Sequence, residues 1–190
     1  MIDWGDYMGY KILKKGILAI IFVLFLISIA SSVNAETNDD NGTDILTLSK
    51  GGLVINYPSN WGYSESTSND SIMAISKLDS IDSAGVGQVN INFEKRHYDG
   101  DFYTFVNDTY KAWQSDSSVK LVSSGGVLLG DRDAFEYVYT SNQNGVEREH
   151  KAVWFEKGGQ AYVLLYSAPI DQFEANLYVF EYILTDIQIT

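Results

Sequence analysis

The sequence has no cysteine, and among its 190 residues only two are histidine, two are proline and 13 are basic. The absence of cysteine excludes disulfides, Cys-ligated zinc and a lipid anchor attached through a thioether. The 13 basic residues stand against 25 acidic ones, a net charge of −12. Nucleic acid and bare anionic membrane are therefore poor partners, because phosphate binding relies on clustered Lys and Arg. A chain without disulfides must be stabilised by its own core, and a domain of about 150 residues is large enough to have one.

The N-terminus has the layout of an export signal. Lys11, Lys14 and Lys15 precede an apolar run over residues 17–30, which Ser28 alone interrupts. As a helix this run spans about 20 Å, less than the roughly 30 Å of a bilayer core. It therefore fits the core of a signal peptide better than a full membrane span. Small residues follow it and predict cleavage after Ala35, and an uncleaved signal anchor is the alternative.

Either form places the following domain outside the cytoplasm, because the Lys cluster stays inside. The true start is open between Met1 and Met8, since Asp3 and Asp6 are unusual in a basic leader. Removal of residues 1–35 leaves 10 basic and 23 acidic residues, a net charge of −13. The sequence thus predicts a signal peptide or anchor over 1–35, a polar disordered tether over 36–44, and one domain over 45–190.

Most of the domain has the two-residue periodicity of strands. In residues 88–93, Val89, Ile91 and Phe93 alternate with polar side chains, which predicts one buried face. Asn144-Gly145 is a hairpin turn signal, and a Ser-Ser-Gly-Gly interruption predicts a bent or bulged strand over 121–129. Residues 160–168 are apolar on both faces and predict a central, covered strand. The predicted strands are residues 53–57, 72–78, 88–93, 121–129, 132–140, 146–156 and 160–168.

Two segments have helical periodicity instead. After Asp101, a predicted N-cap, an aromatic stripe recurs at helical spacing and predicts a helix packed on the sheet. The stripe comprises Phe102, Phe105, Val106, Thr109, Tyr110 and Trp113. Asp171 and Glu174 predict a capping box before a second stripe of Phe173, Leu177, Phe180 and Leu184. The fold class is therefore α+β, with six to seven mainly antiparallel strands flanked by helices.

Four stretches of this chain resemble the PsbP-like family, named for an extrinsic subunit of photosystem II. They are LVINYPSNW (53–61), the helix around 105–113, GDRDAFEYVY (130–139) and QAYVLLYSAPIDQFEANLYVFEYILTDIQI (160–189). The resemblance implies an antiparallel sheet flanked by helices and a non-catalytic subunit that docks on a membrane complex and helps to retain ions. It carries over no catalytic residue. The short 36–44 segment replaces the long N-terminal arm of the photosystem subunit, which argues against a photosystem role.

Two histidine-containing segments are candidate metal ligands. His97, Asp99 and Asp101 lie between a strand and a helix and offer nitrogen and oxygen donors. A solvated loop with Asp101 as a helix cap explains the same residues. In residues 147–150, Glu147 and Glu149 alternate with Arg148 and His150, a pattern that cross-strand surface pairing also explains. No ligand spacing matches a known site, so no metal or cofactor is predicted.

The sequence contains no motif of an enzyme class, with no nucleophile elbow, zinc-protease helix or phosphate-binding loop. Asn41, Asn69 and Asn107 fit the acceptor pattern for N-glycosylation, and Asn41 fits best because Asp follows the other two. Thirteen tyrosines are many for this length, and a Tyr-rich face is typical of interfaces. The face carrying Tyr137 and Tyr139 is the predicted recognition surface, although Tyr is also common in ordinary strands.

The sequence favours an extracytoplasmic, non-catalytic binding or accessory module of PsbP-like fold beside a membrane or cell-envelope complex. A small-ligand or metal-ion carrier with the same fold is the alternative, and an envelope hydrolase is a third class. A pocket lined by Trp and Tyr would favour the carrier. A flat exposed Tyr face would favour the accessory module, and a buried carboxylate pair in a cleft would favour the enzyme.

Overall fold

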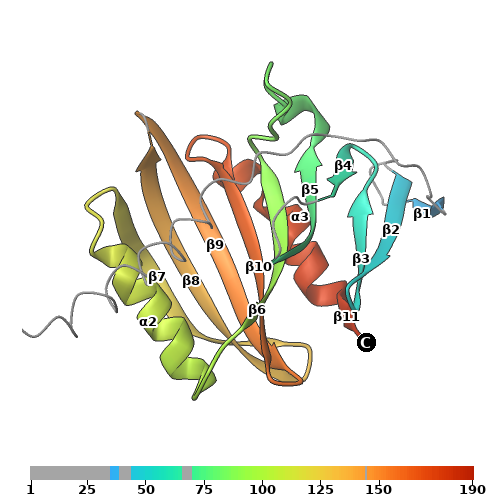
Figure 1. The fold of residues 1–190 in the computed structure, drawn as a ribbon. Coiled ribbons are helices and arrows are strands. Elements are labelled where there is room, and N and C mark those ends of the chain that lie inside the picture. Colours follow the sequence, from blue (N-terminus) through green and yellow to red (C-terminus); the bar gives the residue numbers. More distant parts are fainter. Residues whose placement is uncertain (1–34, 39–43, 66–69, 144) are drawn as a thin grey trace, which may run out of the picture.

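The fold is built on one large antiparallel sheet, seen in a computed structural model that describes residues 35–38, 44–65, 70–143 and 145–190 (Figure 1). Each strand is antiparallel to its neighbours. The sheet has seven strands, in the spatial order β4 (Trp61–Ser64), β5 (Ser71–Lys77), β6 (Asn90–His97), β10 (Gln160–Pro169), β9 (Val146–Lys157), β8 (Arg132–Gln143) and β7 (Val119–Leu129). The α+β fold class with an antiparallel sheet is confirmed.

Strand β10 occupies the centre of this sheet, as its sequence predicts. It pairs with β6 on one side and β9 on the other, and eight of its ten residues, Ala161 to Ala168, are buried. Its even-numbered side chains join one hydrophobic cluster, and Ala161, Val163 and Leu165 join the other. A strand with two covered faces needs apolar residues at consecutive positions, which explains its composition.

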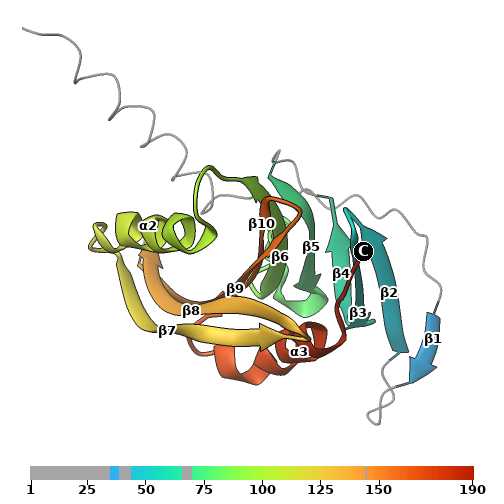
Figure 2. The same ribbon diagram turned by 90° about the horizontal axis from the view of Figure 1, so that it is seen from below.

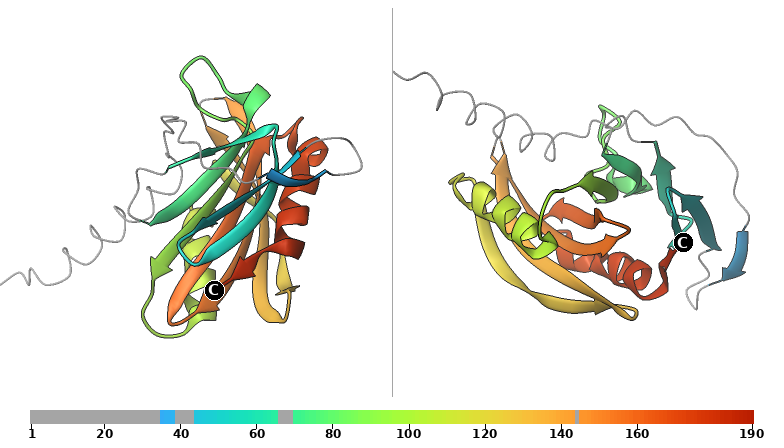
Figure 3. Two further views of the ribbon diagram at one scale, coloured as in Figure 1. Left: turned by 90° about the vertical axis from the view of Figure 1, so that its right-hand side faces the viewer. Right: turned by 60° about the horizontal axis from the view of Figure 1, so that its bottom comes forward.

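Helix α3 (Phe173–Asp186) covers one face of the sheet. Phe173, Val179, Phe180 and Ile183 are buried against the larger core. Figure 3 shows α3 against the sheet from two further directions. The predicted capping box is wrong, because Gln172 is the N-cap residue and no side chain caps it. Burial of the apolar face is thus the main stabilisation of this helix.

Helix α2 (Phe102–Gln114) lies on the opposite face, as Figure 2 shows. Asp101 is its N-cap, as predicted, and its Oδ1 accepts a hydrogen bond from the Thr104 N–H at 2.8 Å. Four residues of the predicted stripe are buried in a second cluster with strand side chains: Phe102, Val106, Tyr110 and Trp113. The predicted stripe is therefore a core contact.

A second sheet of four strands was not predicted. It comprises β1 (Ala35–Asn38), β2 (Asp44–Lys50), β3 (Leu53–Pro58) and β11 (Gln188–Ile189), in that spatial order. The chain end returns to β3, where Gln188 pairs with Val54. The structure also differs from the predicted 36–44 tether, since residues 36–38 belong to β1 and Asp44 begins β2. Strand β1 pairs with the outer edge of β2, whose backbone groups would otherwise have no partner in this sheet.

The turns follow their sequence signals. Gly158 and Gly159 join β9 to β10 with φ of 58° and 70°, the left-handed pair that a two-residue hairpin requires. Gln143 pairs with Val146, so the predicted Asn-Gly hairpin is confirmed, although Asn144 lies outside the described residues. The register of β7 shifts between Leu121 and Ser123, which confirms the predicted bulge. These local signals set the strand order from β7 to β10.

Candidate functional site

Polar side chains form a row across the α2 side of the sheet. The register places Ser76 on β5 opposite Asn90 on β6, Asn90 opposite Ser167 on β10, and Ser167 opposite His150 on β9. We call these four residues the polar row. His150 in turn lies opposite Tyr139, which contacts Trp113 of α2 at a ring-centroid distance of 5.4 Å. The row therefore continues the sheet face beyond the part that α2 covers.

His150 is held by hydrogen bonds at both ring nitrogens. Its Nδ1 lies 2.7 Å from Ser167 Oγ and its Nε2 lies 2.8 Å from Ser141 Oγ. The ring also stacks on Tyr139, with 4.6 Å between centroids. Burial, and to a smaller extent the positive charge of Arg148, lower the pKa of His150 to about 3. His150 is therefore a neutral imidazole at ordinary pH, with no nitrogen left for a metal ion or a substrate.

Arg148 connects β9 to the segment before β6. Its guanidinium donates to the backbone carbonyl of Gln88, and through Nη1 to Gln88 Oε1 at 3.1 Å. Gln88 Nε2 then donates to Asp82 Oδ2 at 2.9 Å. The predicted surface position is therefore wrong for both Arg148 and His150. Cross-strand pairing is confirmed for His150, which bonds Ser167 directly opposite it, whereas Arg148 bonds Gln88 outside the named strands. Both side chains are partly buried and bond to residues distant in sequence.

Glu149 faces the other side of the sheet, as the alternation predicts. Burial raises its pKa, and the negative charge of Glu174 on α3 raises it further. Glu149 and His150 therefore do not form a shared ligand set. Among the described residues, no group of three His, Asp or Glu side chains is arranged to hold a metal ion.

A buried ion pair lies further along the same face as the polar row. Glu94 Oε2 accepts from Arg96 Nη2 at 2.7 Å, and the Glu94 side chain is only 4% exposed. The Arg96 guanidinium lies 5.9 Å from the Trp154 ring centroid. Nearby on β6, Asn92 is 6% exposed, and its Oδ1 has no hydrogen-bond partner in the described parts of the chain. This face therefore combines one satisfied buried charge pair with one unsatisfied acceptor.

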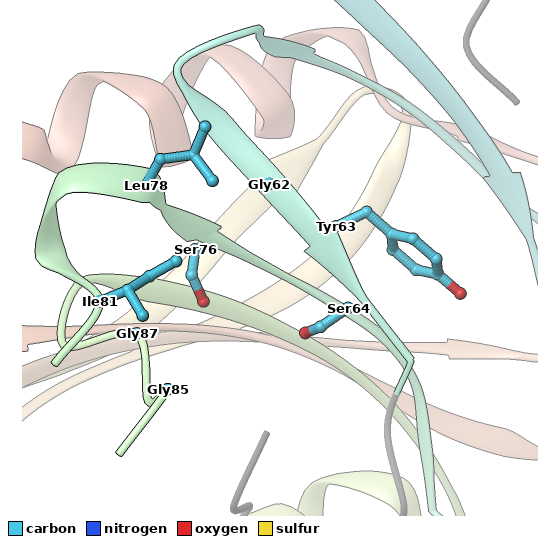
Figure 4. Close-up of a pocket in the computed structure, with 8 residues that line it drawn as sticks. All are labelled: Gly62, Tyr63, Ser64, Ser76, Leu78, Ile81, Gly85 and Gly87. Atoms are coloured by element: carbon cyan, nitrogen blue, oxygen red, sulfur yellow. The ribbon is translucent and has the colours of Figure 1, made fainter. Parts of the chain in front are cut away.

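A small pocket adjoins the Ser76 end of the polar row. Its volume is about 20 Å³, room for little more than one water molecule, and about 270 Å³ when all the open space at its mouth is counted. Ser64 lines it and is 3% exposed, yet its Oγ has no hydrogen-bond partner among the described residues. Figure 4 shows the Ser64 and Ser76 hydroxyls on the pocket wall. The pocket is lined by Gly62, Tyr63, Ser64, Ser76, Leu78, Ile81, Gly85 and Gly87.

Glycine at position 87 is required for the shape of this pocket. A Cβ added there would lie 2.3 Å from both Cβ and Oγ of Ser76, closer than atoms in proteins pack. The pocket therefore offers two hydroxyls and glycine backbone within an apolar wall, an arrangement suited to a small polar ligand. Carboxylates are absent from its lining.

The remaining predicted ligands are separated. His97 Nε2 lies 3.5 Å from Asp99 Oδ1, and both side chains are mostly exposed. Asp101 is used as the cap of α2. The predicted recognition face is wrong, because Tyr137 and Tyr139 are 5% and 6% exposed beneath α2. Tyrosine is abundant here because it builds this core.

The predicted modification sites are only partly within the described residues. Asn41 and Asn69 lie outside them. Asn107 is exposed on α2, where its Oδ1 accepts from Tyr137 Oη at 2.6 Å. Ala35 is the first residue of β1 and pairs with Leu46. Residues 1–34 of the predicted signal segment lie outside the described residues. Among the residues that the structure does describe, no helix is long and apolar enough to cross a membrane.

No sequence pattern indicates Ser64, Ser76 or Asn92 as candidate site residues. Each is an ordinary polar residue in a strand, and only the pairing of β4, β5 and β6 brings them together. The sequence indicates His150 as a possible ligand, but its two serine partners lie on other strands.

The architecture described above is a PsbP-like fold. The cyanobacterial PsbP (CyanoP) of Synechocystis sp. PCC 6803 has a similar structure, with a TM-score of 0.54 and 14% identity over 86% of this chain and 95% of that one. LpqN of Mycobacterium tuberculosis, a protein involved in cell envelope biogenesis, has a TM-score of 0.57 and 17% identity over 73% of this chain and 83% of that one. At these identities the likeness establishes the fold alone. No family model matches the sequence, and no curated protein matches it.

Proposed function

We propose that this protein is an extracytoplasmic, non-catalytic binding module that associates with a membrane or cell-envelope complex. The observation that carries the proposal is the fold, which this chain shares over most of its length with CyanoP and with LpqN. The second of these is involved in cell envelope biogenesis. The basic, apolar N-terminus supports an extracytoplasmic location.

The chemistry of the polar row also supports a binding role. A general base must have a free nitrogen or oxygen within hydrogen-bond reach of its substrate. His150 uses both ring nitrogens on serine hydroxyls, and Glu94 is occupied by Arg96. These groups stabilise the sheet face and are not positioned to transfer protons to a bound molecule.

Affinity capture from crosslinked native membranes tests the proposal. The full-length chain carries a C-terminal tag, and the intact mass is read on the same sample. The control is an exported protein of unrelated fold that carries the same tag. Stoichiometric recovery of one envelope complex with the full-length chain supports the proposal. Recovery of the protein alone, as a soluble chain that begins at Glu36, would overturn it.

The pocket beside the polar row supports a second candidate, a small-ligand carrier. The specific observation is the buried Ser64 Oγ, which has no hydrogen-bond partner in the described part of the chain, because a buried hydroxyl without a partner carries a free-energy penalty that a ligand would remove. Native mass spectrometry of protein from its own host tests this candidate. A bound mass that is lost in Ser64→Ala and retained in Ser123→Ala supports the carrier. An unliganded mass in every sample contradicts it.

A further inference from the structure

Strand β7 is a long, exposed edge of the seven-stranded sheet. Among the strands that the structure describes it pairs with β8 alone, and every residue from Lys120 to Gly126 is exposed. Three of the nine large hydrophobic side chains that are exposed among the described residues lie on this one strand: Leu121, Val122 and Leu128. An edge strand with apolar side chains presents unpaired backbone groups that can add another strand.

Few features protect this edge from pairing. Lys120 is the only charged residue in β7, and the strand contains no proline. The bulge between Leu121 and Ser123 leaves the rest of β7 in regular register with β8. The chain has a net charge of −12, yet β7 has no acidic residue. A second acidic molecule therefore meets less like-charge repulsion here than the overall composition would indicate.

We propose that β7 pairs antiparallel with β7 of a second copy of this chain, forming a two-fold symmetric dimer with one continuous sheet. The centre of the strand favours a close approach, because Ser123, Ser124, Gly125 and Gly126 are small. A Cβ at either glycine would have no atom within 4 Å. A two-fold axis perpendicular to the sheet requires one residue to lie opposite itself, because paired residues must face the same side.

The positions of the exposed side chains select Gly125 as that residue. With Gly125 at the axis, Ser123 lies opposite Val127 of the second copy. The bulge then sets Leu121 and Val122 together opposite Leu128, as one residue faces two at a bulge. The three exposed apolar side chains of each copy thus cover those of the other. This symmetry is the reason that a second copy, rather than an unrelated protein, fits the edge.

Charges at the two ends of β7 agree with the same register. Lys120 at one end comes opposite Leu129 of the second copy, diagonal to Asp131 beyond it. Diagonal neighbours across antiparallel strands are within reach of a long side chain. Both Lys120 and Asp131 are exposed, and the symmetry makes the contact twice. A parallel pairing would place the two Lys120 residues together.

Single-cysteine variants test the dimer and its register, because the chain has no cysteine of its own. In the proposed dimer of Gly125→Cys, position 125 of one copy lies opposite position 125 of the other. Their Cα atoms are about 4.5–5.5 Å apart, a separation that allows a disulfide. In Leu128→Cys the two copies of the residue are about 20 Å apart along the strands. Full-length variants, exported and mildly oxidised, are compared on non-reducing gels, with circular dichroism confirming the fold.

The expected result is a crosslinked dimer for Gly125→Cys at least about tenfold more abundant than for Leu128→Cys. Light scattering of the unmodified chain should give twice the monomer mass. The double variant Val122→Lys with Leu128→Lys should have the mass of a monomer. The matched control is Ile170→Lys with Val146→Lys, two exposed sites away from β7. Equal crosslinking at both cysteines, or a monomer mass at the highest soluble concentration, would overturn the proposal. The proposed dimer does not depend on the membrane or cell-envelope complex proposed above.

Discussion

Trp154 Nε1 donates a hydrogen bond to Tyr110 Oη at 2.8 Å, joining the centre of α2 to strand β9 beneath it. Both residues are almost fully buried. Tyr110 also stacks on Tyr137, with a centroid distance of 3.7 Å and an interplanar angle of 6°. Burial raises the pKa of Tyr110 well above its ordinary value, so the hydroxyl stays neutral and serves as a structural acceptor.

Tyr110→Phe should destabilise the domain by about 1–3 kcal/mol, because it leaves the Trp154 N–H buried without a partner. The ring and its stacking on Tyr137 are retained, so the change isolates the hydrogen bond. Urea unfolding measures the free energy. Tyr103→Phe, at a position that is 43% exposed, is the matched control and should change stability by less than about 0.5 kcal/mol. Equal effects of the two substitutions would contradict the role of this hydrogen bond.

The pH dependence of stability should reveal the buried neutral His150. Its pKa is about 3 in the folded protein and 6.5 in the reference state. Between these values the unfolded chain binds the extra proton, so stability is full above about pH 6.5 and falls as the pH decreases towards 3. The contribution of this one group has a maximum slope of about 1.4 kcal/mol per pH unit.

The difference between the original chain and His150→Gln isolates this contribution. At pH 7 the variant should be less stable by about 1 kcal/mol, because glutamine replaces the two serine hydrogen bonds imperfectly. The difference in unfolding free energy between the two proteins should shrink and then change sign as the pH falls below 6, because the variant has no imidazole at this position to protonate. Denaturant titrations at several pH values measure it, with the exposed His97→Gln as the control. A gap that is constant from pH 4 to 7 would rule out a buried neutral His150.

The ion pairs of Lys151 should stabilise the contact between the sheet and α3. Lys151 Nζ lies 2.9 Å from Glu136 Oε2 and 2.6 Å from Glu181 Oε1, and its side chain is 15% exposed. Lys151→Met should cost about 2–4 kcal/mol, because it leaves two carboxylates facing an apolar group. Glu181→Gln should cost less than about 1 kcal/mol, because Glu181 is 46% exposed. Thermal unfolding ranks the two variants, and the reverse order would contradict this account.

The close approach of Gly87 to Ser76 predicts a large effect of one methyl group. Gly87→Ala should destabilise the domain by at least about 1 kcal/mol, because the new Cβ would overlap the Ser76 side chain. Gly126→Ala, which adds the same methyl where no atom lies within 4 Å, should be neutral or stabilising by a few tenths of a kcal/mol. Denaturant midpoints compare the two. A neutral Gly87→Ala would show that this segment moves freely.

The N-terminus and the glycosylation state remain predictions that one sample can test. The protein recovered from its native host should begin at Glu36, with Asn41 as the first choice for a glycan. Asn107 should be unmodified, because it lies within α2 and its amide oxygen bonds Tyr137. Terminal sequencing and intact mass measure both. A chain that still begins at Met1 or Met8 would indicate an uncleaved signal anchor.

Local signals in the sequence predicted the elements well. The spacing of Phe102, Val106, Tyr110 and Trp113 predicted α2 and its buried face, and Asp101 predicted its start. The capping box at Asp171 failed, because α3 is held in place by Phe173 and Phe180 in the core and does not need a capping side chain. Periodicity thus located faces that must be buried, without showing what buries them.

The sequence by itself determined the strands, turns and helix faces, because these follow from backbone geometry that repeats every 2 or 3.6 residues. Tertiary structure alone decided which distant segments meet. It brought Ser76, Asn90, His150 and Ser167 into one row, buried Tyr137 and Tyr139 beneath α2, and left β7 at an open edge. These outcomes depend on how all apolar faces are covered together, and no local run of residues contains that information.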